Sequence, residues 1–469
     1  MERDELLRTK NKTKIRMSAK KKRVAVIGCG ASGISALVAF AKAQENGGEI
    51  PEVVCFEKQS SMGGLWIYDG RVGVNEYGEP IRSPMYRDLR LNSPKEVEEY
   101  YDYTYDEHFG QKPIPSYCDR ATKLDYLIGR AKKYDVEKFV KFSSVVIKVE
   151  KLGDEFSVIY KHLPSKESFE ESFDYVIVAS GLHSIPKTPN YPGIDTFPSR
   201  IIHSTDFKLP DELKLIDCLL IIGTSFSAMD IATFHYKIGG RKTLLSYHGE
   251  KPSFDLKWPD SVSYVSDLAH VSGSVCTFKD GSQYKVDMIV FATGYELKFP
   301  FLEPKLRLEA QGYRFVHHDL YKGVFYHGEP SMFYIGMLIP IYTLTLYERQ
   351  AWLIKEFLMD RFTLPSKEDR KLDIDVWIQK AQSLPKRGGP LTNDPIYYNW
   401  LLDYMKDIVE LTWKDTSKER KINNISEDRR KRVQVGRNNS IRDAVWTSCL
   451  IFTERHESFD DLLVLKLEQ

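Results

Sequence analysis

The sequence predicts an α/β fold, in which short buried strands of parallel sheets alternate with helices. Two segments, 24–43 and 219–237, each combine an apolar strand, a turn of small residues and a stretch of helix formers. Two further apolar strands, 174–179 and 287–292, also end in turns of small residues. Because the chain has 469 residues, we expect two or three domains rather than one.

Composition and charge exclude several classes of protein. Hydrophobic residues make up 42% of the chain and charged residues 28%, which suits a sizeable core and excludes a disordered chain or a small disulfide scaffold. The 67 Lys and Arg nearly balance the 66 Asp and Glu, so no overall positive charge favours nucleic-acid binding. Residues 1–22 are locally basic. We expect a solvated, disordered arm there, and a targeting or nucleic-acid-binding segment stays an alternative.

The cysteines and the hydropathy pattern indicate a cytoplasmic protein. The six cysteines include no CxxC pair and no His/Cys cluster at zinc spacing, so we expect reduced thiols and no metal site. No apolar run reaches the roughly eighteen residues that a membrane-spanning helix needs, so we expect no membrane anchor.

The first glycine motif follows the predicted strand 24–27 directly. Gly28, Gly30 and Gly33 form the pattern GxGxxG and precede a helix predicted over 34–43. Gly28 permits a tight turn, Gly30 lets a pyrophosphate approach the backbone, and Gly33 lets the helix pack closely on the strand. The free N–H groups of the helix N-terminus then attract phosphate.

An acidic residue stands where this motif requires one. A second strand, 52–56, ends at Glu57, close to the usual offset for a carboxylate that binds a ribose hydroxyl. Such an acid favours a ribose without a 2′-phosphate, as in FAD or NAD. Further along, Gly63–Trp66 suits a loop that lies against a flat cofactor, although a turn with a core Trp explains it equally well.

The second glycine motif is weaker. Gly223 follows the strand 219–222, and the small residues Ser225 and Ser227 keep the turn narrow before a helix predicted to run to about Lys237. Taken alone, this segment is equally compatible with an ordinary turn. A following strand, 242–247, completes a second β-α-β unit, and two such units suggest two dinucleotides, one of them diffusible.

These motifs together resemble the flavin-containing monooxygenases, within the class B flavoprotein monooxygenases. The family signature FxGxxxHxxx(Y/F) is matched over Phe197–Phe207, with Ser199 in place of the glycine. Phe207 favours this family over Baeyer–Villiger relatives, which carry Trp there. Within the family, the sequence is most similar to soluble enzymes of the trimethylamine-monooxygenase type, from about Arg23 to about Phe459. Shared stretches include Tyr77–Pro80 and Lys257–Pro259.

The resemblance implies an enzyme that uses FAD and NADPH to oxygenate a soft nitrogen or sulfur nucleophile with O2, through a C4a-hydroperoxyflavin. Asn92 matches the active-site asparagine of the family. Residues implied to bind FAD are Gly28, Gly30, Ser32, Gly33, Glu57, Gln59, Leu65, Trp66 and Val146. Residues implied to bind the nicotinamide nucleotide are Gly223, Thr224, Ser225, Ser227, His248 and Lys251. Alternatives are a Baeyer–Villiger or N-hydroxylating monooxygenase, or a catalytically silent FAD-binding protein. A homodimer is expected.

The implied fold has two Rossmann-like dinucleotide-binding domains, each built of three layers in the order ββα. The smaller NADP domain is inserted in the FAD domain. We expect the basic arm over 1–22, the first part of the FAD domain over 23–190, the NAD(P) domain over 191–297, and the rest of the FAD domain with a C-terminal segment over 298–469.

Three departures from the trimethylamine-type enzymes predict differences in function. His248 and Lys251 stand near the place of an Arg-Thr pair that holds the 2′-phosphate, so we expect a weaker NADPH preference or mixed use of NADPH and NADH. Phe226 replaces a tyrosine beside the nicotinamide, which predicts a changed hold on the cofactor. The apolar stretch 338–342 replaces a polar one near the flavin and favours a bulkier, more hydrophobic substrate than trimethylamine.

Overall fold

The computed structural model describes residues 21–384, apart from 101, 111, 253–257, 309–316 and 339–342, together with 403 and 407. Nearly all of the predicted basic arm therefore lies outside the described residues, as does the apolar stretch beyond Leu338. Lys22, the last residue of that arm, pairs with Asp360 at 2.8 Å. Within the described part, no helix is both long and apolar enough to cross a membrane.

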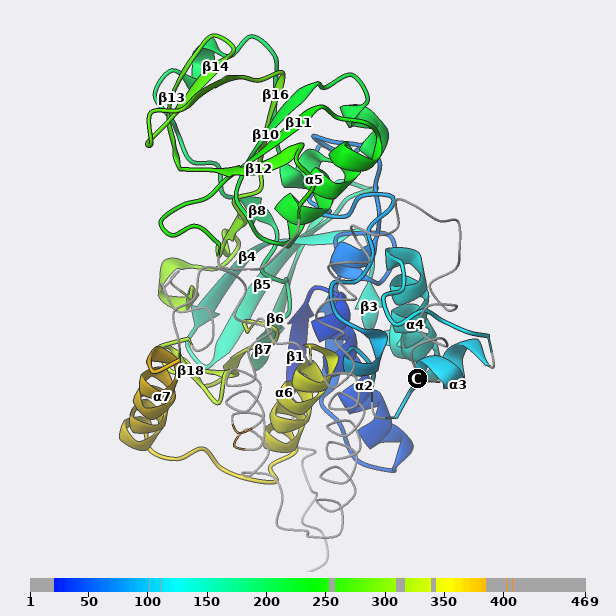
Figure 1. Cartoon of the computed structure of the whole chain (residues 1–469). Coiled ribbons are helices and arrows are strands. Elements are labelled where there is room, and N and C mark those ends of the chain that lie inside the picture. The colour runs from blue at the N-terminus through cyan, green and yellow to red at the C-terminus, as the bar shows by residue number, and fades with distance from the viewer. Residues whose placement is uncertain are drawn as a thin grey trace, which may run out of the picture.

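A seven-stranded sheet forms the larger body of the molecule (Figure 1). Its central strands run parallel, because each of them is a short apolar segment that is buried on both faces. The strands, in their spatial order, are β18 (Leu320–Tyr321), β19 (Phe325–Tyr326), β20 (Met332–Tyr334), β7 (Tyr175–Val178), β1 (Arg23–Ile27), β2 (Glu52–Phe56) and β3 (Val140–Lys141).

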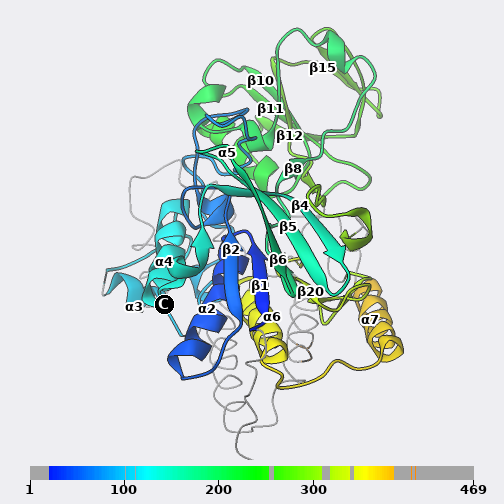
Figure 2. The same ribbon diagram turned by 180° about the vertical axis from the view of Figure 1, so that it is seen from behind.

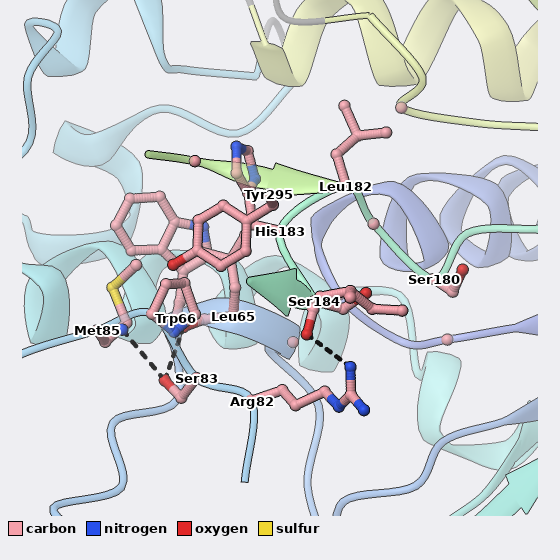
Figure 3. Close-up of a pocket in the computed structure, with 18 of the residues that line it drawn as sticks. Leu65, Trp66, Arg82, Ser83, Met85, Ser180, Leu182, His183, Ser184 and Tyr295 are labelled. Atoms are coloured by element: carbon pink, nitrogen blue, oxygen red, sulfur yellow. Dashed lines mark hydrogen bonds between the residues drawn. The ribbon is translucent and has the colours of Figure 1, made fainter. Parts of the chain in front are cut away.

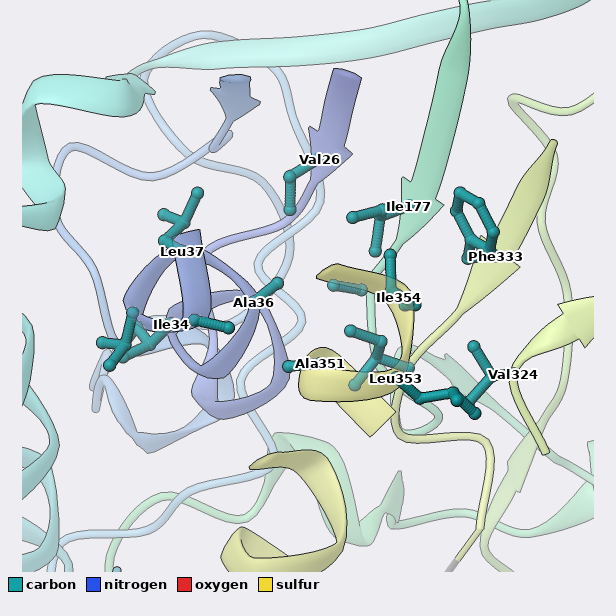
Figure 4. Packing of buried hydrophobic residues seen from close by; sticks show 14 of the residues in the cluster. Val26, Ile34, Ala36, Leu37, Ile177, Val324, Phe333, Ala351, Leu353 and Ile354 are labelled. Carbon is teal, nitrogen blue, oxygen red and sulfur yellow. The ribbon is translucent and has the colours of Figure 1, made fainter. Parts of the chain in front are cut away.

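Alternate residues of β1 belong to different layers. Val24 and Val26 pack in the cluster that includes the helices α2 (Ala31–Glu45) and α6 (Thr343–Leu358), as Figure 4 shows around Val26, Ile34 and Ile354. Ala25 and Ile27 pack on the opposite face, against the antiparallel sheet of β4 (Ser144–Leu152), β5 (Glu155–His162) and β6 (Ser168–Phe173). Figures 1 and 2 show these layers from the two sides. The alternation follows from the two-residue period of a strand.

A five-stranded parallel sheet repeats this arrangement in the smaller body. Its order is β12 (Val262–Val265), β11 (Lys242–Ser246), β10 (Cys218–Ile222), β16 (Met288–Phe291) and β9 (Arg200–His203). Leu219 and Ile221 of β10 face the helix α5 (Phe226–Lys237), whereas Leu220 and Ile222 face residues of the second antiparallel sheet. That sheet comprises β13 (Leu268–Ser272), β14 (Val275–Phe278) and β15 (Gln283–Lys285).

Two crossings join the bodies. The chain leaves the larger sheet after β7 and returns to it only at β18, and the strands of the five-stranded sheet all lie between these points. The short strands β8 (Ile185–Pro186) and β17 (Tyr295–Glu296) pair antiparallel where the two crossings run side by side. The remaining helices are α3 (Tyr105–Phe109), α4 (Arg120–Lys133) and α7 (Lys367–Gln382).

The predicted fold class is confirmed: the protein is α/β, with two Rossmann-like units of three ββα layers each. The first helix begins at Ala31, three residues before its predicted start, because the Ile34 amide already donates to the Gly30 carbonyl at 2.8 Å. The domain boundaries given above stay predictions.

Candidate active site

One cavity of about 2780 Å³ runs along the carboxyl ends of the parallel strands of both sheets. Open α/β sheets bind ligands at this edge. Both glycine motifs line the cavity, and so do the small-residue turns that follow β7 and β16. Its volume exceeds the roughly 300–1,000 Å³ of a pocket for one drug-sized ligand, so it has room for two dinucleotides.

The first glycine turn is built for close approach. Gly28 has a φ of +100°, and a Cβ there would lie 2.7 Å from the Ala179 carbonyl oxygen. A Cβ on Gly33 would lie 2.0 Å from the Gly28 carbonyl oxygen, so only glycine lets α2 start this close to β1. Gly33 does not itself line the cavity, which agrees with the packing role expected from its position in the motif.

The first turn of α2 presents its amide groups to the cavity. Its N-cap is Gly30, and no side chain of the described residues caps the helix. The unpaired N–H groups of such a terminus bind anions, and phosphate in particular. Ser32 lies on the same turn and also lines the cavity.

Glu57 holds the glycine turn in place. Its carboxylate is 4% exposed and accepts hydrogen bonds from the amides of Cys29 at 2.7 Å and Gln59 at 2.8 Å. Burial raises the pKa of Glu57, and the two backbone hydrogen bonds oppose that rise. Glu57 also lines the cavity, so the predicted ribose-binding position is available to it, although two of its acceptor sites already serve the backbone.

The second glycine pair packs directly on the first glycine turn. The Gly63 amide donates to the Cys29 carbonyl at 3.0 Å, and a Cβ on Gly64 would lie 2.7 Å from the Gly30 Cα. The short helix η1 (Gly64–Trp66) then brings Leu65 and Trp66 to the cavity wall, where Figure 3 shows them beside His183 and Tyr295. The Gln59 side chain donates to the Gly64 carbonyl at 3.2 Å. Val146 of β4 also lines the cavity.

The second glycine turn repeats the first with a single glycine. Gly223 has a φ of +122°, and a Cβ there would lie 2.3 Å from the Ala292 carbonyl oxygen. Each first glycine therefore packs against the small-residue turn of a neighbouring strand, which explains why those turns follow β7 and β16. Ser225 is the N-cap of α5 and makes no side-chain cap bond among the described residues, so this helix also offers free amides. Thr224, Ser225 and Ser227 all line the cavity.

The two residues predicted near the 2′-phosphate lie in different places. His248 lines the cavity, and its Nδ1 lies 2.9 Å from Oδ2 of Asp267. Lys279 donates to the same oxygen at 2.8 Å, and these two partners hold the pKa of Asp267 below its usual range despite partial burial. The structure does not bring Lys251 to the cavity wall: its Nζ lies 5.9 Å from the centre of the Tyr264 ring.

The predicted active-site asparagine, Asn92, lines the same cavity as Trp66. Phe226, the first residue of α5, also lines the cavity. These positions bring the first glycine turn, the second glycine turn and Asn92 to one continuous space.

The signature segment and the residue that follows it contact the loop that leads to Asn92. The ring of Phe207 packs 5.6 Å from that of Tyr86, and Lys208 donates to the Ser83 carbonyl at 2.7 Å. Arg82 on the same loop donates to the Ser184 carbonyl at 2.9 Å, as Figure 3 shows. Ser199, which replaces the signature glycine, does not have a positive φ, so the substitution costs no backbone strain.

The side chains in the cavity wall fit FAD and a nicotinamide dinucleotide. Two glycine faces leave room for a pyrophosphate, two uncapped helix termini can bind its charge, and aromatic and apolar side chains line the space between them. Within the described residues, no group of three or more His, Cys, Asp or Glu could hold a metal ion.

Sequence reasoning missed four charged or polar side chains that the fold brings to the cavity. The hydroxyl of Tyr86 donates to the carboxylate of Asp230 on α5, and Glu98 pairs with Lys123 on α4. Each pair joins segments far apart in the chain, so no local spacing reveals it. The one available signal was the polar residue Asp230 on an otherwise apolar stretch of helix.

Comparison with known proteins agrees with this geometry. The family model described as "Flavin-binding monooxygenase-like" matches residues 21–251 and 260–417. A trimethylamine monooxygenase from Methylocella silvestris is 42% identical over 392 residues, which are 83% of this chain and 84% of the relative.

Solved structures give the same result. The crystal structure of Tmm from Pelagibacter sp. strain HTCC7211 has a TM-score of 0.78 and 34% identity, and the match covers 83% of this chain and 86% of that one. The structure of S-allyl-L-cysteine S-oxygenase from Allium sativum has a TM-score of 0.68 and 25% identity, over 92% of this chain and 98% of that one. The predicted resemblance is confirmed. The chain therefore belongs to the flavin-binding monooxygenase-like family, and it is an FAD- and NADPH-dependent monooxygenase.

Proposed function

We propose that this enzyme oxygenates the nitrogen of tertiary amines that are larger and more apolar than trimethylamine. The observation that carries the proposal is the cavity that both glycine turns line together with a group of apolar side chains. Met337, Leu338, Leu344 and Tyr347 contribute to this wall. A wall of this kind gains free energy from each additional apolar group of a substrate.

Different residues are proposed to bind FAD and NADPH. The amides at the start of α2 and the backbone of Gly30 hold the FAD pyrophosphate, with Glu57 toward the ribose and Gln59, Leu65, Trp66 and Val146 around the rest. Thr224, Ser225 and Ser227 hold the pyrophosphate of NADPH in the same way. Bound FAD, reduced by NADPH, supplies the chemistry with O2, so the side chains need only position the substrate and exclude water.

Asn92 is the proposed catalytic residue. It is the one predicted catalytic side chain, and it lines the same cavity as the proposed flavin-binding residues. Its amide can both donate and accept a hydrogen bond, which suits contact with the bound nucleotide and with the oxygen that is transferred.

A substrate screen tests the proposal. The holoenzyme is incubated with NADPH and with trimethylamine, larger tertiary amines, sulfides or a cyclic ketone, and products are identified by mass spectrometry. We expect amine N-oxides, with kcat/KM several-fold higher for larger amines than for trimethylamine. A preference for trimethylamine contradicts the substrate size, a lactone product indicates a Baeyer–Villiger enzyme, and no NADPH-dependent oxygen uptake indicates a silent FAD-binding protein.

Sulfides are the second candidate class. The structural match to S-allyl-L-cysteine S-oxygenase spans nearly the whole of both chains, and sulfur is a soft nucleophile like an amine nitrogen. A sulfoxide formed with higher kcat/KM than any N-oxide favours this alternative.

The choice of dinucleotide is the second prediction. We expect kcat/KM for NADPH and NADH to differ by less than about tenfold, because His248 offers no permanent charge and Asp267 places a carboxylate at this end of the cavity. Replacing Asp267 with Asn removes that negative charge and raises the NADPH preference several-fold, as measured by steady-state kinetics with both nucleotides. A large NADPH preference that survives His248→Ala and Lys251→Ala contradicts the prediction.

We also propose that the enzyme acts in the cytoplasm as a homodimer. We expect it to bind neither nucleic acids nor membranes. Five cysteines in the described part of the chain are free thiols, which supports a reducing compartment. Light scattering of the holoenzyme decides the oligomeric state, since a dimer has twice the 54.3 kDa of one chain.

A further inference from the structure

A buried ion pair stands in the cavity wall close to Asn92. Lys123 of α4 is 0% exposed and Glu98 is 7% exposed. The Lys123 Nζ lies 3.2 Å from Oε2 of Glu98 and also donates to the Glu98 backbone carbonyl at 2.9 Å. Both residues line the cavity.

Aromatic rings enclose the lysine. Its Nζ lies 5.9 Å from the ring centre of Trp66, 5.9 Å from that of Tyr105 and 5.8 Å from that of Tyr126. Burial lowers the pKa of Lys123, and the Glu98 carboxylate opposes that shift. The Glu98 carboxylate therefore favours the charged ammonium, which faces the ring of Trp66, a proposed flavin-binding residue.

The second oxygen of the same carboxylate reaches two other segments. Oε1 of Glu98 accepts hydrogen bonds from the Ser93 hydroxyl at 3.0 Å and the Thr343 hydroxyl at 3.3 Å. One carboxylate thus joins the loop that carries Asn92, the helix α4 and the first residue of α6. A charged, buried acceptor gives stronger hydrogen bonds than a neutral one.

The placement of Asn92 depends on its neighbours. The backbone on either side is tied to the segment before α4, with the Leu91 amide 2.9 Å from the Cys118 carbonyl and the Lys95 amide 2.6 Å from the Ser116 carbonyl. None of the hydrogen bonds among the described residues holds the Asn92 amide itself. The bond from Ser93 to Glu98 is therefore the side-chain contact nearest to it that fixes this stretch of loop.

We infer that Glu98 and Lys123 are a positioning pair, which acts through Ser93 to hold the Asn92 amide at the cavity. This role rests on the proposed function of Asn92. In this role the ion pair acts by keeping the loop fixed while nucleotide and substrate exchange.

A double-mutant cycle tests the route through Ser93. Ser93→Ala, Asn92→Ala and the double variant are compared for hydrogen peroxide released per NADPH oxidised, and for the Kd of NADP⁺ from the change in flavin absorbance. We expect Ser93→Ala to raise peroxide release and Kd by about threefold to tenfold, with FAD content and Tm unchanged. In the Asn92→Ala background we expect Ser93→Ala to change neither peroxide release nor Kd further, because the hydrogen bond from Ser93 to Glu98 then has no Asn92 amide to position.

Charge variants test the ion pair with a matched control. Lys123→Met removes the ammonium, leaves the Glu98 carboxylate unpaired, and is expected to raise peroxide release at least as much as Ser93→Ala does. Adding Glu98→Gln restores neutrality and Tm but not the coupling of NADPH oxidation to product. The control is Lys322→Met: Lys322 is 6% exposed and pairs with Asp373 at 2.7 Å and Asp407 at 2.5 Å, outside the cavity wall. We expect it to lower Tm without changing peroxide release.

The outcomes separate the two claims. If Asn92→Ala changes neither peroxide release nor Kd, the proposed role of Asn92 fails and the positioning pair with it. If Asn92→Ala changes both while Ser93→Ala and Lys123→Met change neither, only the positioning pair is overturned. Additive effects of Ser93→Ala and Asn92→Ala also overturn it, as does an equal rise in peroxide release with Lys322→Met.

Discussion

Asp230 is a carboxylic acid of the cavity wall whose pKa lies close to neutral pH. Its carboxylate accepts a hydrogen bond from the Tyr86 hydroxyl, which comes from the loop that leads to Asn92. Burial raises the pKa of Asp230 to about 6, although Tyr86 and Lys237 both favour the charged form. The protonation of this group therefore changes within the pH range in which enzymes are usually assayed.

The pH dependence of stability follows from that shift. Since the pKa in the folded state lies above that in the unfolded state, the contribution of Asp230 to stability is complete below pH about 4 and is lost as the pH rises through about 6. Asp230→Asn keeps an acceptor for Tyr86 but has no proton to lose. We expect the free energy of unfolding of this variant, relative to the wild type, to rise by an amount on the order of 1 kcal/mol between pH 4.5 and 6.5 and then to level off. The Tm of the variant, measured against that of the wild type at each pH, follows the same course. A difference that stays constant from pH 4.5 to 8 contradicts the prediction.

Individual residues also show where sequence reasoning stops. Glu57 was recognisable from its offset to the glycine motif, but its hydrogen bonds to the amides of Cys29 and Gln59 depend on a fold that no spacing encodes. His248 lines the cavity whereas Lys251 does not, because the loop after β11 turns the lysine toward Tyr264. The effect of Phe226 in place of tyrosine stays a prediction.

At the scale of secondary-structure elements, two glycines of the first turn have different roles: Gly33 permits close packing of a helix on a strand, and Gly30 lies where we propose that the ligand binds. A Cβ on Gly33 would overlap the Gly28 carbonyl oxygen at 2.0 Å, so α2 would have to move away from β1. A Cβ on Gly30 would meet Gly64 Cα at 3.4 Å, an ordinary contact, but Gly30 lines the cavity where we propose that the pyrophosphate binds.

These two glycines give a matched pair of variants. We expect Gly33→Ala to lower the free energy of unfolding by about 3 kcal/mol and to lose FAD, since overpacking displaces the helix. Gly30→Ala is expected to keep the stability of the FAD-free protein and to lose only FAD affinity. Calorimetry of the FAD-free proteins and FAD titration measure the two effects. Equal loss of stability in both variants would show that the turn cannot be divided in this way.

The predictability of each element depends on its hydrophobic pattern. Six parallel strands were predicted to within one residue, because runs such as Leu219–Ile222 are apolar throughout and end at a turn residue, whereas β3, β9, β12 and β20 were not predicted. The antiparallel sheets were not predicted. Strand β6 reads Ser-Phe-Glu-Glu-Ser-Phe and β15 has three residues, so neither carries a pattern that a single sequence distinguishes from a loop.

Across the whole molecule, one cavity depends on both sheets. The signature segment and the two crossings bring the second glycine turn opposite the first, and Arg82, Lys208 and Tyr86 tie the loop before Asn92 to both bodies. The sequence predicted the two units and their resemblance to a family. It could not predict the ties, because each joins residues separated by about a hundred positions or more, and one sequence contains no sign of such pairings.

The threading of the chain also determines the order in which the two sheets can form during synthesis. The five-stranded sheet is complete once Phe291 has left the ribosome, whereas the seven-stranded sheet still lacks β20, which pairs with β7. At translation rates of about 5–20 residues per second, β7 waits several seconds for that partner with one edge uncovered. The sheet that begins first is therefore finished last, and the nascent chain passes through a stage in which only the smaller unit is folded.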